Sequence, residues 1–67
     1  MSENTWRVFT VDTQGSKKYL IRMDTVRGLG NFKVFGRHAS KAILLSRDKA
    51  YLLSLELEHS GIEEVGA

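Results

Sequence analysis

Two segments rich in β-branched and aromatic residues, joined by a short turn signal, constrain the fold of this chain most. The segments are Thr5–Asp12 and Lys17–Met23, and residues 13–16 (TQGS) separate them. Gly15 lies where a tight turn needs a positive φ, which glycine adopts without steric penalty. The pattern predicts an antiparallel β-hairpin near the start of the chain.

A two-residue turn at residues 14–15 would set the register of this hairpin. It would pair Phe9 with Leu20 and place Arg7 opposite Arg22. Because side chains alternate between the two faces of a strand, this register predicts which residues share a face. The expected core face carries Trp6, Val8, Thr10, Tyr19, Ile21 and Met23. The expected second face carries Arg7, Phe9, Val11, Lys18, Leu20 and Arg22.

The middle of the chain predicts two further short strands. Residues 24–31 hold two of the six glycines and predict a loop. A strand is expected over Phe32–Phe35, and Arg37–Lys41 then reads as a polar connection. Ala42–Leu45 is expected to form a fourth, buried strand because it is short and wholly apolar.

A helix is predicted over Arg47–His59. Ser46 can cap its start, and Gly61 lies near its expected end. Residues that favour helix, namely Ala, Leu, Glu and Lys, dominate this stretch. An alternative stays open, because residues 51–58 also alternate with the period of a strand.

The predicted helix would be apolar on two sides. Ala50, Leu53 and Leu57 fall on one side of it. Leu52 and Leu55 fall on nearly the opposite side, so the helix needs two partners. One partner would be its own sheet, and the other a second copy of the chain or a different protein. The candidate partner or dimer interface is Tyr51, Leu52 and Leu55.

Together these segments predict an α+β fold in a single domain over residues 1–67. We expect a small three- to four-stranded antiparallel sheet, led by the N-terminal β-hairpin and packed on one C-terminal helix. A chain of this length buries only about 60% of its unfolded surface, and it has no cysteine for a disulfide. Self-association is therefore the expected additional stabiliser. The expected core is Trp6, Val8, Ile21, Val34, Ile43, Leu45, Leu53 and Leu57.

The chain offers little for catalysis or for cofactor binding. Its Ser, His and Asp residues occur in no pattern that places a nucleophile beside a base, so we expect no enzymatic activity. His38 and His59 are the only imidazoles and cysteine is absent, so neither a metal site nor a cofactor is expected. The first residues lack the apolar region of a signal peptide, which leads us to expect a cytoplasmic protein.

Positive charge is confined to the first three quarters of the chain. All ten Lys and Arg residues lie within residues 1–49, against four acids there, which gives a net charge of +6. Residues 50–67 hold four glutamates and no basic residue, which gives −4. Such an excess of positive charge in residues 1–49 is informative about binding partners.

The second face of the predicted hairpin is the candidate nucleic-acid interface. Arg7 and Arg22 would stand opposite each other there, and like charges across two strands are destabilising. Guanidinium and ammonium groups neutralise phosphates, and aromatic rings stack on bases. The candidate contacts are Arg7, Phe9, Lys18, Arg22, Arg27, Lys33 and Arg37.

The expected function is a small non-enzymatic nucleic-acid-binding accessory or regulatory protein, with DNA as the expected partner. Two alternatives stay open for the same face. The C-terminal helix could cover Phe9, Val11 and Leu20, with the cations at its rim. In the second alternative, a partner protein binds this face. A separate rival is that the chain is an interaction module, such as an inhibitor or an antitoxin-like protein, that binds a protein through its Leu-rich helix or a sheet edge.

Part of the chain resembles a known family of regulators. Residues 32–58 (FKVFGRHASKAILLSRDKAYLLSLELE) are similar to the middle of Phd/YefM-type antitoxins, and residues 42–46 (AILLS) match best. In that family an apolar strand ending in Leu-Ser or Val-Ser precedes a helix rich in Leu and Glu. The hairpin followed by a helix also resembles the arm-type DNA-binding domains of phage integrases. Both resemblances imply a small DNA-associated regulator of a mobile element.

Overall fold

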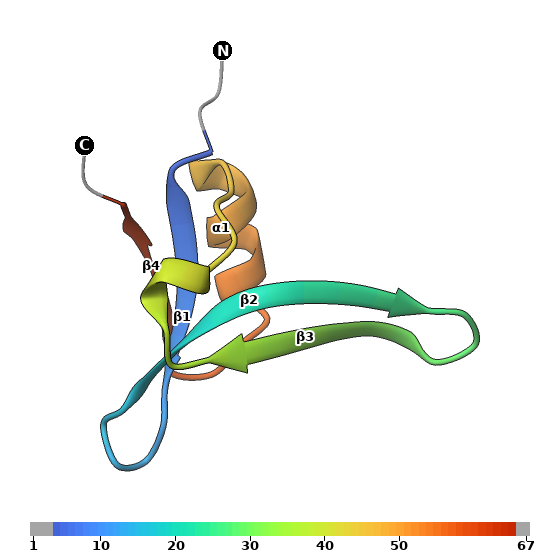
Figure 1. The fold of residues 1–67 in the computed structure, drawn as a ribbon, viewed down its shortest axis with the longest axis horizontal. Helices are drawn as coiled ribbons and strands as arrows, with labels where there is room; N and C mark the ends of the chain where they lie inside the picture. Colours follow the sequence, from blue (N-terminus) through green and yellow to red (C-terminus); the bar gives the residue numbers. More distant parts are fainter. Residues whose placement is uncertain (1–3, 66–67) are drawn as a thin grey trace.

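The computed structural model describes residues 4–65, which form one four-stranded antiparallel sheet with a single α-helix packed against it (Figure 1). The strands are β1 (Trp6–Val11), β2 (Lys17–Val26), β3 (Gly30–Gly36) and β4 (Ser60–Glu64). Their order across the sheet is β3-β2-β1-β4. A short 3-10 helix, η1 (Ala39–Lys41), and the helix α1 (Arg47–Ser54) lie between β3 and β4. The predicted α+β class and the N-terminal hairpin are confirmed.

The hairpin of β1 and β2 has a longer turn than predicted. Phe9 pairs with Tyr19, and the predicted pairing with Leu20 is wrong by one residue. The backbone N–H of Gly15 donates to the carbonyl of Asp12 at 3.0 Å, and Gly15 has a φ of 84°. The N–H of Asp12 donates to the carbonyl of Ser16, also at 3.0 Å, so three residues form the loop. This arrangement is a common three-residue hairpin turn with glycine at its left-handed position.

A one-residue change of register turns the paired β2 side chains to the other face. Leu20, predicted on the second face, is fully buried together with Val8 and Ala50. Tyr19, predicted in the core, lies beside Phe9 on the opposite face, with 6.4 Å between the ring centroids. The core is therefore built partly from other residues than expected.

The core consists of Val8, Leu20 and Ala50 with partly buried apolar residues packed around them. Five of the predicted core residues surround these three: Trp6, Ile43, Leu45, Leu53 and Leu57. Ile21 and Val34, also predicted, are not part of this cluster. Phe35 and Ile62 take part in it instead. The exchange follows from the register, because Phe35 pairs with Leu20 and Ile62 pairs with Val8, which places both on the face of the buried residues.

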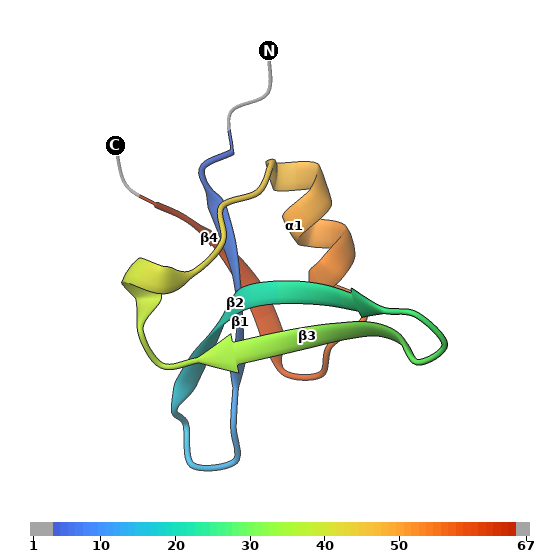
Figure 2. The ribbon, with the colours of Figure 1, turned by 45° about the vertical axis from the view of Figure 1, so that its right-hand side comes forward.

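A bulge at Ile21 divides β2 into two halves. Leu20 pairs with Phe35, whereas the next ladder pair is Arg22 with Val34, which leaves Ile21 as the extra residue. A bulge bends the strand that contains it. Beyond this point β2 and β3 leave β1 and project from the body as a two-stranded hairpin (Figures 1 and 2). We call residues 22–34 the arm.

Residues 43–45 occupy the edge of β1 that β2 leaves free. Trp6 and Leu45 exchange two backbone hydrogen bonds of 2.9 and 2.7 Å, and the N–H of Ile43 donates to the carbonyl of Leu20 at 3.0 Å. The predicted fourth strand over Ala42–Leu45 is therefore reduced to a single isolated bridge between Leu45 and Trp6. The segment still contributes Ile43 and Leu45 to the core.

The helix α1 begins as predicted but ends earlier. The Ser46 side chain caps it by accepting a hydrogen bond from the N–H of Lys49 at 3.4 Å. The predicted extension to His59 is wrong, and so is the alternative of a strand across this region. The hydroxyl of Ser60 shares its one hydrogen between the carbonyls of Ser54, at 2.6 Å, and Leu57, at 2.9 Å. These contacts satisfy carbonyls that a longer helix would have used.

The strand β4 lies beyond the predicted helix, where no strand was expected from the sequence. It pairs with β1 over five residues, from Thr10 with Ser60 to Trp6 with Glu64. His59 has a φ of 50°, a left-handed conformation that reverses the chain between α1 and β4. Gly61, expected near the helix end, lies in β4 directly against the ring of Phe9. β4 holds only one strongly apolar residue, Ile62, so its composition does not indicate a strand.

Candidate functional site

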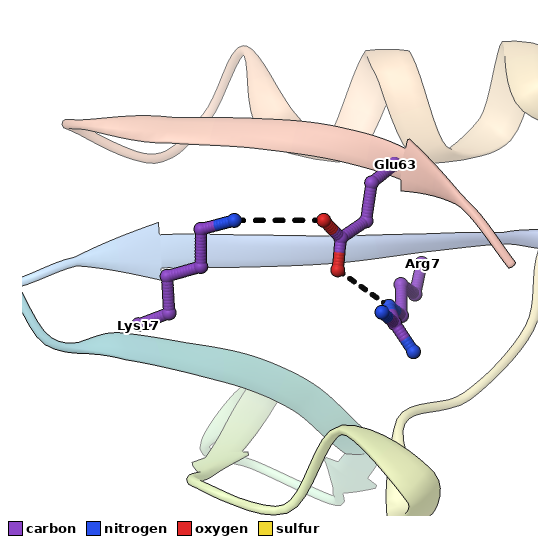
Figure 3. Close-up of polar contacts among 3 residues, drawn as sticks. All are labelled: Arg7, Lys17 and Glu63. Atoms are coloured by element: carbon purple, nitrogen blue, oxygen red, sulfur yellow. Dashed lines mark hydrogen bonds and ion pairs between the residues drawn. The ribbon is translucent and has the colours of Figure 1, made fainter.

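The outer face is the side of the sheet that turns away from α1. It contains Arg7 and Phe9 of β1, Lys17 and Tyr19 of β2, and Glu63 of β4. Val8 and Leu20, which alternate with these residues, point to the helix side and are buried there. Figure 3 shows the ionic groups of Arg7, Lys17 and Glu63 in front of the strands with the helix behind them. The alternative in which α1 covers Phe9, Val11 and Leu20 is therefore wrong for Phe9, whereas Leu20 is buried on the helix side.

Glu63 joins the two cations of the outer face. Arg7 Nε lies 2.6 Å from Glu63 Oε1, and Lys17 Nζ lies 3.5 Å from Glu63 Oε2 (Figure 3). Arg7 and Glu63 stand directly opposite each other in the β1–β4 ladder. Burial raises the pKa of Glu63, but the hydrogen bond from Arg7 and the charges of Arg7 and Lys17 together bring it below its ordinary value. The carboxylate therefore stays ionised at neutral pH, and the three groups carry a net charge of +1.

The two aromatic rings of the outer face each lie under a cation. Lys17 Nζ is 4.4 Å from the ring centroid of Phe9, and Arg7 Cζ is 4.9 Å from that of Tyr19. Such contacts are attractive because the face of an aromatic ring is electron-rich. Phe9 also packs against Gly61, where an added Cβ would lie only 2.7 Å from Phe9 Cζ. Phe9 thus helps to hold β4 against β1.

Two further cations, Lys18 and Arg37, lie close enough to Asp12 for their charges to act on it, where the β1–β2 turn meets the segment after β3. The backbone N–H groups of Gln14 and Ser16 each donate to Asp12 Oδ1 at 2.9 Å. The Ser16 hydrogen bond is the largest cause that lowers the pKa of Asp12, and the charges of Lys18 and Arg37 lower it further. Within residues 4–65, no acidic oxygen lies within 4.0 Å of a side-chain nitrogen of Lys18 or Arg37. We call Asp12, Lys17, Lys18 and Arg37 the hairpin end.

The remaining predicted cations lie on the arm and are held separately. Arg22 Nε contacts Asp24 Oδ2 at 2.9 Å, and it does not stand opposite Arg7 as predicted. Lys33 Nζ contacts Glu56 Oε2, beyond the end of α1, at 3.2 Å. Arg27 lies in the turn between β2 and β3. The structure therefore divides the seven predicted contacts among the outer face, the hairpin end and the arm.

Sequence reasoning missed Lys17, Tyr19 and Glu63. The expected two-residue turn places Tyr19 on the core face and assigns Lys17 to neither face. Asp12 followed three residues later by Gly15 is the signal that could have corrected this. An Asp side chain readily accepts hydrogen bonds from backbone groups two or more residues on, which favours the longer turn. The contact of Glu63 with the two cations follows only from the pairing of β4 with β1.

Two apolar surfaces lie outside these charged groups. Tyr51, Leu52 and Leu55 on α1 are 55%, 63% and 63% exposed. The arm exposes Met23 and Phe32 beside a notch of about 460 Å³ between the arm and the end of α1. Leu29 at the arm tip is 74% exposed. These surfaces are available to macromolecular partners.

Comparisons with known proteins do not place the chain in a family. No family model, no curated protein and no solved structure matches it. Among residues 4–65, no three His, Asp or Glu side chains come together as a metal site would require. No helix within the same residues has both the length and the apolar character needed to cross a membrane.

Proposed function

We propose that the protein is a small, non-enzymatic, cytoplasmic nucleic-acid-binding accessory or regulatory protein that contacts phosphates through its hairpin end. The observation that carries the proposal is that the charges of Lys18 and Arg37 both act on Asp12, next to Lys17 of the outer face. Lys18 comes from β2 and Arg37 follows Gly36 of β3, which pairs with Tyr19, so the sheet brings two cations from distant parts of the chain close together. Asp12 is the acid on which both charges act, and its carboxylate already accepts hydrogen bonds from two loop amides.

The outer face adjoins the hairpin end through Lys17. Arg7 and Lys17 share Glu63, and both are within reach of solvent, with side chains 22% and 47% exposed. A phosphate could replace Glu63 as the partner of Lys17 without moving the strands. Nucleic-acid binding through phosphates is driven by the release of condensed counterions and needs no base-specific contact. The proposal therefore concerns affinity for the polyanion and makes no claim of sequence preference.

Salt titration tests this proposal directly. We expect the protein to bind a fluorescent DNA duplex or the matching single strand at about 50 mM salt, with log K falling linearly against log salt. The double variant Lys18→Ala/Arg37→Ala should flatten that slope by about two units, one for each lost phosphate contact. Arg27→Ala is the matched control, because it removes one cation from the arm turn and should leave the slope nearly unchanged.

A second variant tests the outer face. Glu63→Gln removes the acid that holds Arg7 and Lys17, so it should tighten binding to the same duplex and steepen the salt dependence. Absence of binding by the wild-type protein to both oligonucleotides at about 50 mM salt, where electrostatic binding is strong, rejects the proposal. If Arg27→Ala loses as much DNA affinity as Lys18→Ala/Arg37→Ala, the interface lies on the arm.

The alternative is a protein-interaction module, and a specific observation favours it. The arm projects from the body with Met23, Leu29 and Phe32 exposed, and β3 is an edge strand of the sheet. An exposed edge beside apolar side chains is suited to pairing with a strand of another protein. Under this alternative Phe32→Glu abolishes capture of a purified partner, whereas Lys18→Ala/Arg37→Ala has no effect.

A further inference from the structure

The exposed side of α1 carries an apolar stripe with helical spacing. Tyr51, Leu52 and Leu55 follow Asp48 at intervals of three, one and three residues, which places all four on one side of the helix. Leu55 still has helical backbone angles, with φ −66° and ψ −21°. The core-facing side of α1 is formed by Ala50, Leu53 and Ser54. We call Tyr51, Leu52 and Leu55 the α1 stripe.

The charges beside the α1 stripe oppose the dipole of the helix. Arg47 and Lys49 lie at its beginning, where the dipole favours acids, and only Asp48 has the favourable sign. The last turn contains no basic residue, and Glu56 and Glu58 follow directly. In an isolated helix this arrangement is mildly unfavourable. It becomes favourable if the beginning of one helix lies beside the end of another.

We propose that two copies of the chain associate through the α1 stripe, with their α1 helices antiparallel about a two-fold axis. Such a contact uses the same patch on both copies, so a residue that meets a second residue across the axis is in turn met by that residue's counterpart. An axis between Tyr51 and Leu52 sets Tyr51 of one copy against Leu52 of the other. In antiparallel helix pairs, like flanks face each other. Lys49 lies in the first turn of α1 and Glu56 lies two residues beyond its end, so the antiparallel pairing brings Lys49 of each copy toward Glu56 of its partner, which already contacts Lys33.

A hollow at the start of α1 fits this arrangement. It has a volume of about 220 Å³ and is lined by Arg47, Asp48 and Tyr51. In the antiparallel pairing Leu55 of the second copy lies against this hollow, since residue 55 meets residue 48.

The charges at the two ends of α1 are complementary to those of a second copy only in the antiparallel orientation. This self-complementarity is what selects a second copy over another protein as the occupant.

The expected dimer is weak and reversible. Three exposed side chains supply less than the roughly 800 Å² per partner that a standard interface buries. We therefore expect a dissociation constant on the order of 100 μM, with rapid exchange between monomer and dimer. The α1 stripe and the hairpin end lie on different elements, so dimer formation and nucleic-acid binding can be measured and can fail independently.

Sedimentation velocity of the full chain, from low micromolar to near-millimolar concentration, tests the proposal. The wild-type weight-average mass should rise with concentration toward twice the monomer mass. Leu52→Glu should raise the dissociation constant by at least about tenfold, because it places a charge where an apolar side chain is buried. Leu29→Glu is the matched control on the arm, and it should leave the association unchanged. Circular dichroism checks that both variants are folded.

Charge exchange tests the orientation. Lys49→Glu should weaken association, and the double variant Lys49→Glu/Glu56→Lys should restore it, because the flank pair is re-formed with its signs reversed. Glu56→Lys also breaks the contact with Lys33, so it is measured alone as a reference. A wild-type protein that remains monomeric throughout the concentration range overturns the proposal. Equal effects of Leu52→Glu and Leu29→Glu also overturn it, by placing the contact outside the α1 stripe.

Discussion

The body and the arm belong to the same sheet but differ in what covers them. In the body, α1 lies over β1 and β4, and Val8 and Leu20 are fully buried between the layers. In the arm, no second layer covers the two strands along most of their length, and Met23, Leu29 and Phe32 are exposed. The bulge at Ile21 marks the boundary between the two regions.

The comparison shows where the stability of this small domain resides. Apolar burial stabilises a fold in proportion to the area removed from water, so the body provides most of the stability. A two-stranded hairpin alone is marginal in water, and the arm is supported mainly by its backbone ladder and by the contact between Lys33 and Glu56. Sequence changes of the same kind should therefore have very different effects in the two regions.

Leu20→Ala should have the largest effect on the free energy of unfolding. Leu20 is fully buried, and such truncations typically cost about 2–5 kcal/mol. Leu29→Ala removes the same atoms from the arm turn, where the side chain is 74% exposed, and should change stability by about 0.5 kcal/mol or less. Urea denaturation followed by circular dichroism measures both. Similar losses from the two variants would contradict the division into body and arm.

Gly61→Ala tests the packing of β4 on β1. The added Cβ would lie 2.7 Å from Phe9 Cζ, so either the ring or the strand must move. Overpacking of this kind typically costs about 1–3 kcal/mol. Phe9→Leu should relieve much of the clash, so the double variant should be less destabilised than the sum of the single changes. Strictly additive effects in thermal denaturation would show that Phe9 does not press on Gly61.

Sequence reasoning identified the elements of this fold more reliably than their pairing. The β1–β2 hairpin, the Ser46 cap and the core positions of Val8, Leu53 and Leu57 follow from local patterns. The register of the β1–β2 hairpin does not follow from local patterns, because it depends on the length of one turn. A difference of one residue in that turn places Leu20 in the core and Tyr19 on the outer face. The strand β4 could not be read from its composition, since it forms by pairing with β1, which lies far away in the sequence.

The candidate site was affected by the same difficulty. Arg7 and Phe9 lie on one face as expected, but Lys17 replaces Lys18 beside them. Like-charge repulsion between Arg7 and Arg22 was expected, whereas Arg7 is paired with Glu63. Contacts between residues close in sequence can be inferred from spacing. A contact that joins residues 7 and 63 requires the tertiary fold.

Glu63→Gln should reduce stability by about 1 kcal/mol or less at neutral pH, since a partly exposed ion pair contributes modestly. The pKa of Glu63 lies below its ordinary value of 4.5 in the folded protein. Its contribution is therefore fully present above that value and is lost as the pH falls through the folded pKa. The difference between wild type and variant, measured by urea denaturation at several pH values, should shrink in acid. A difference that grows as the pH falls would mean that Glu63 is not stabilised as an anion.

The smallest effect should come from the contact that joins the arm to the end of α1. Lys33 and Glu56 are 3.2 Å apart, but the Glu56 side chain is 62% exposed, so Glu56→Gln should lower global stability by about 0.5 kcal/mol or less. Its local effect should be clearer, because the arm has little other tertiary support. Hydrogen exchange at the amides of the β2–β3 ladder should accelerate in this variant, whereas the amides that join β1 to β4 should not change. If both ladders accelerate equally, the arm is not a separate unit and the body extends across the bulge at Ile21.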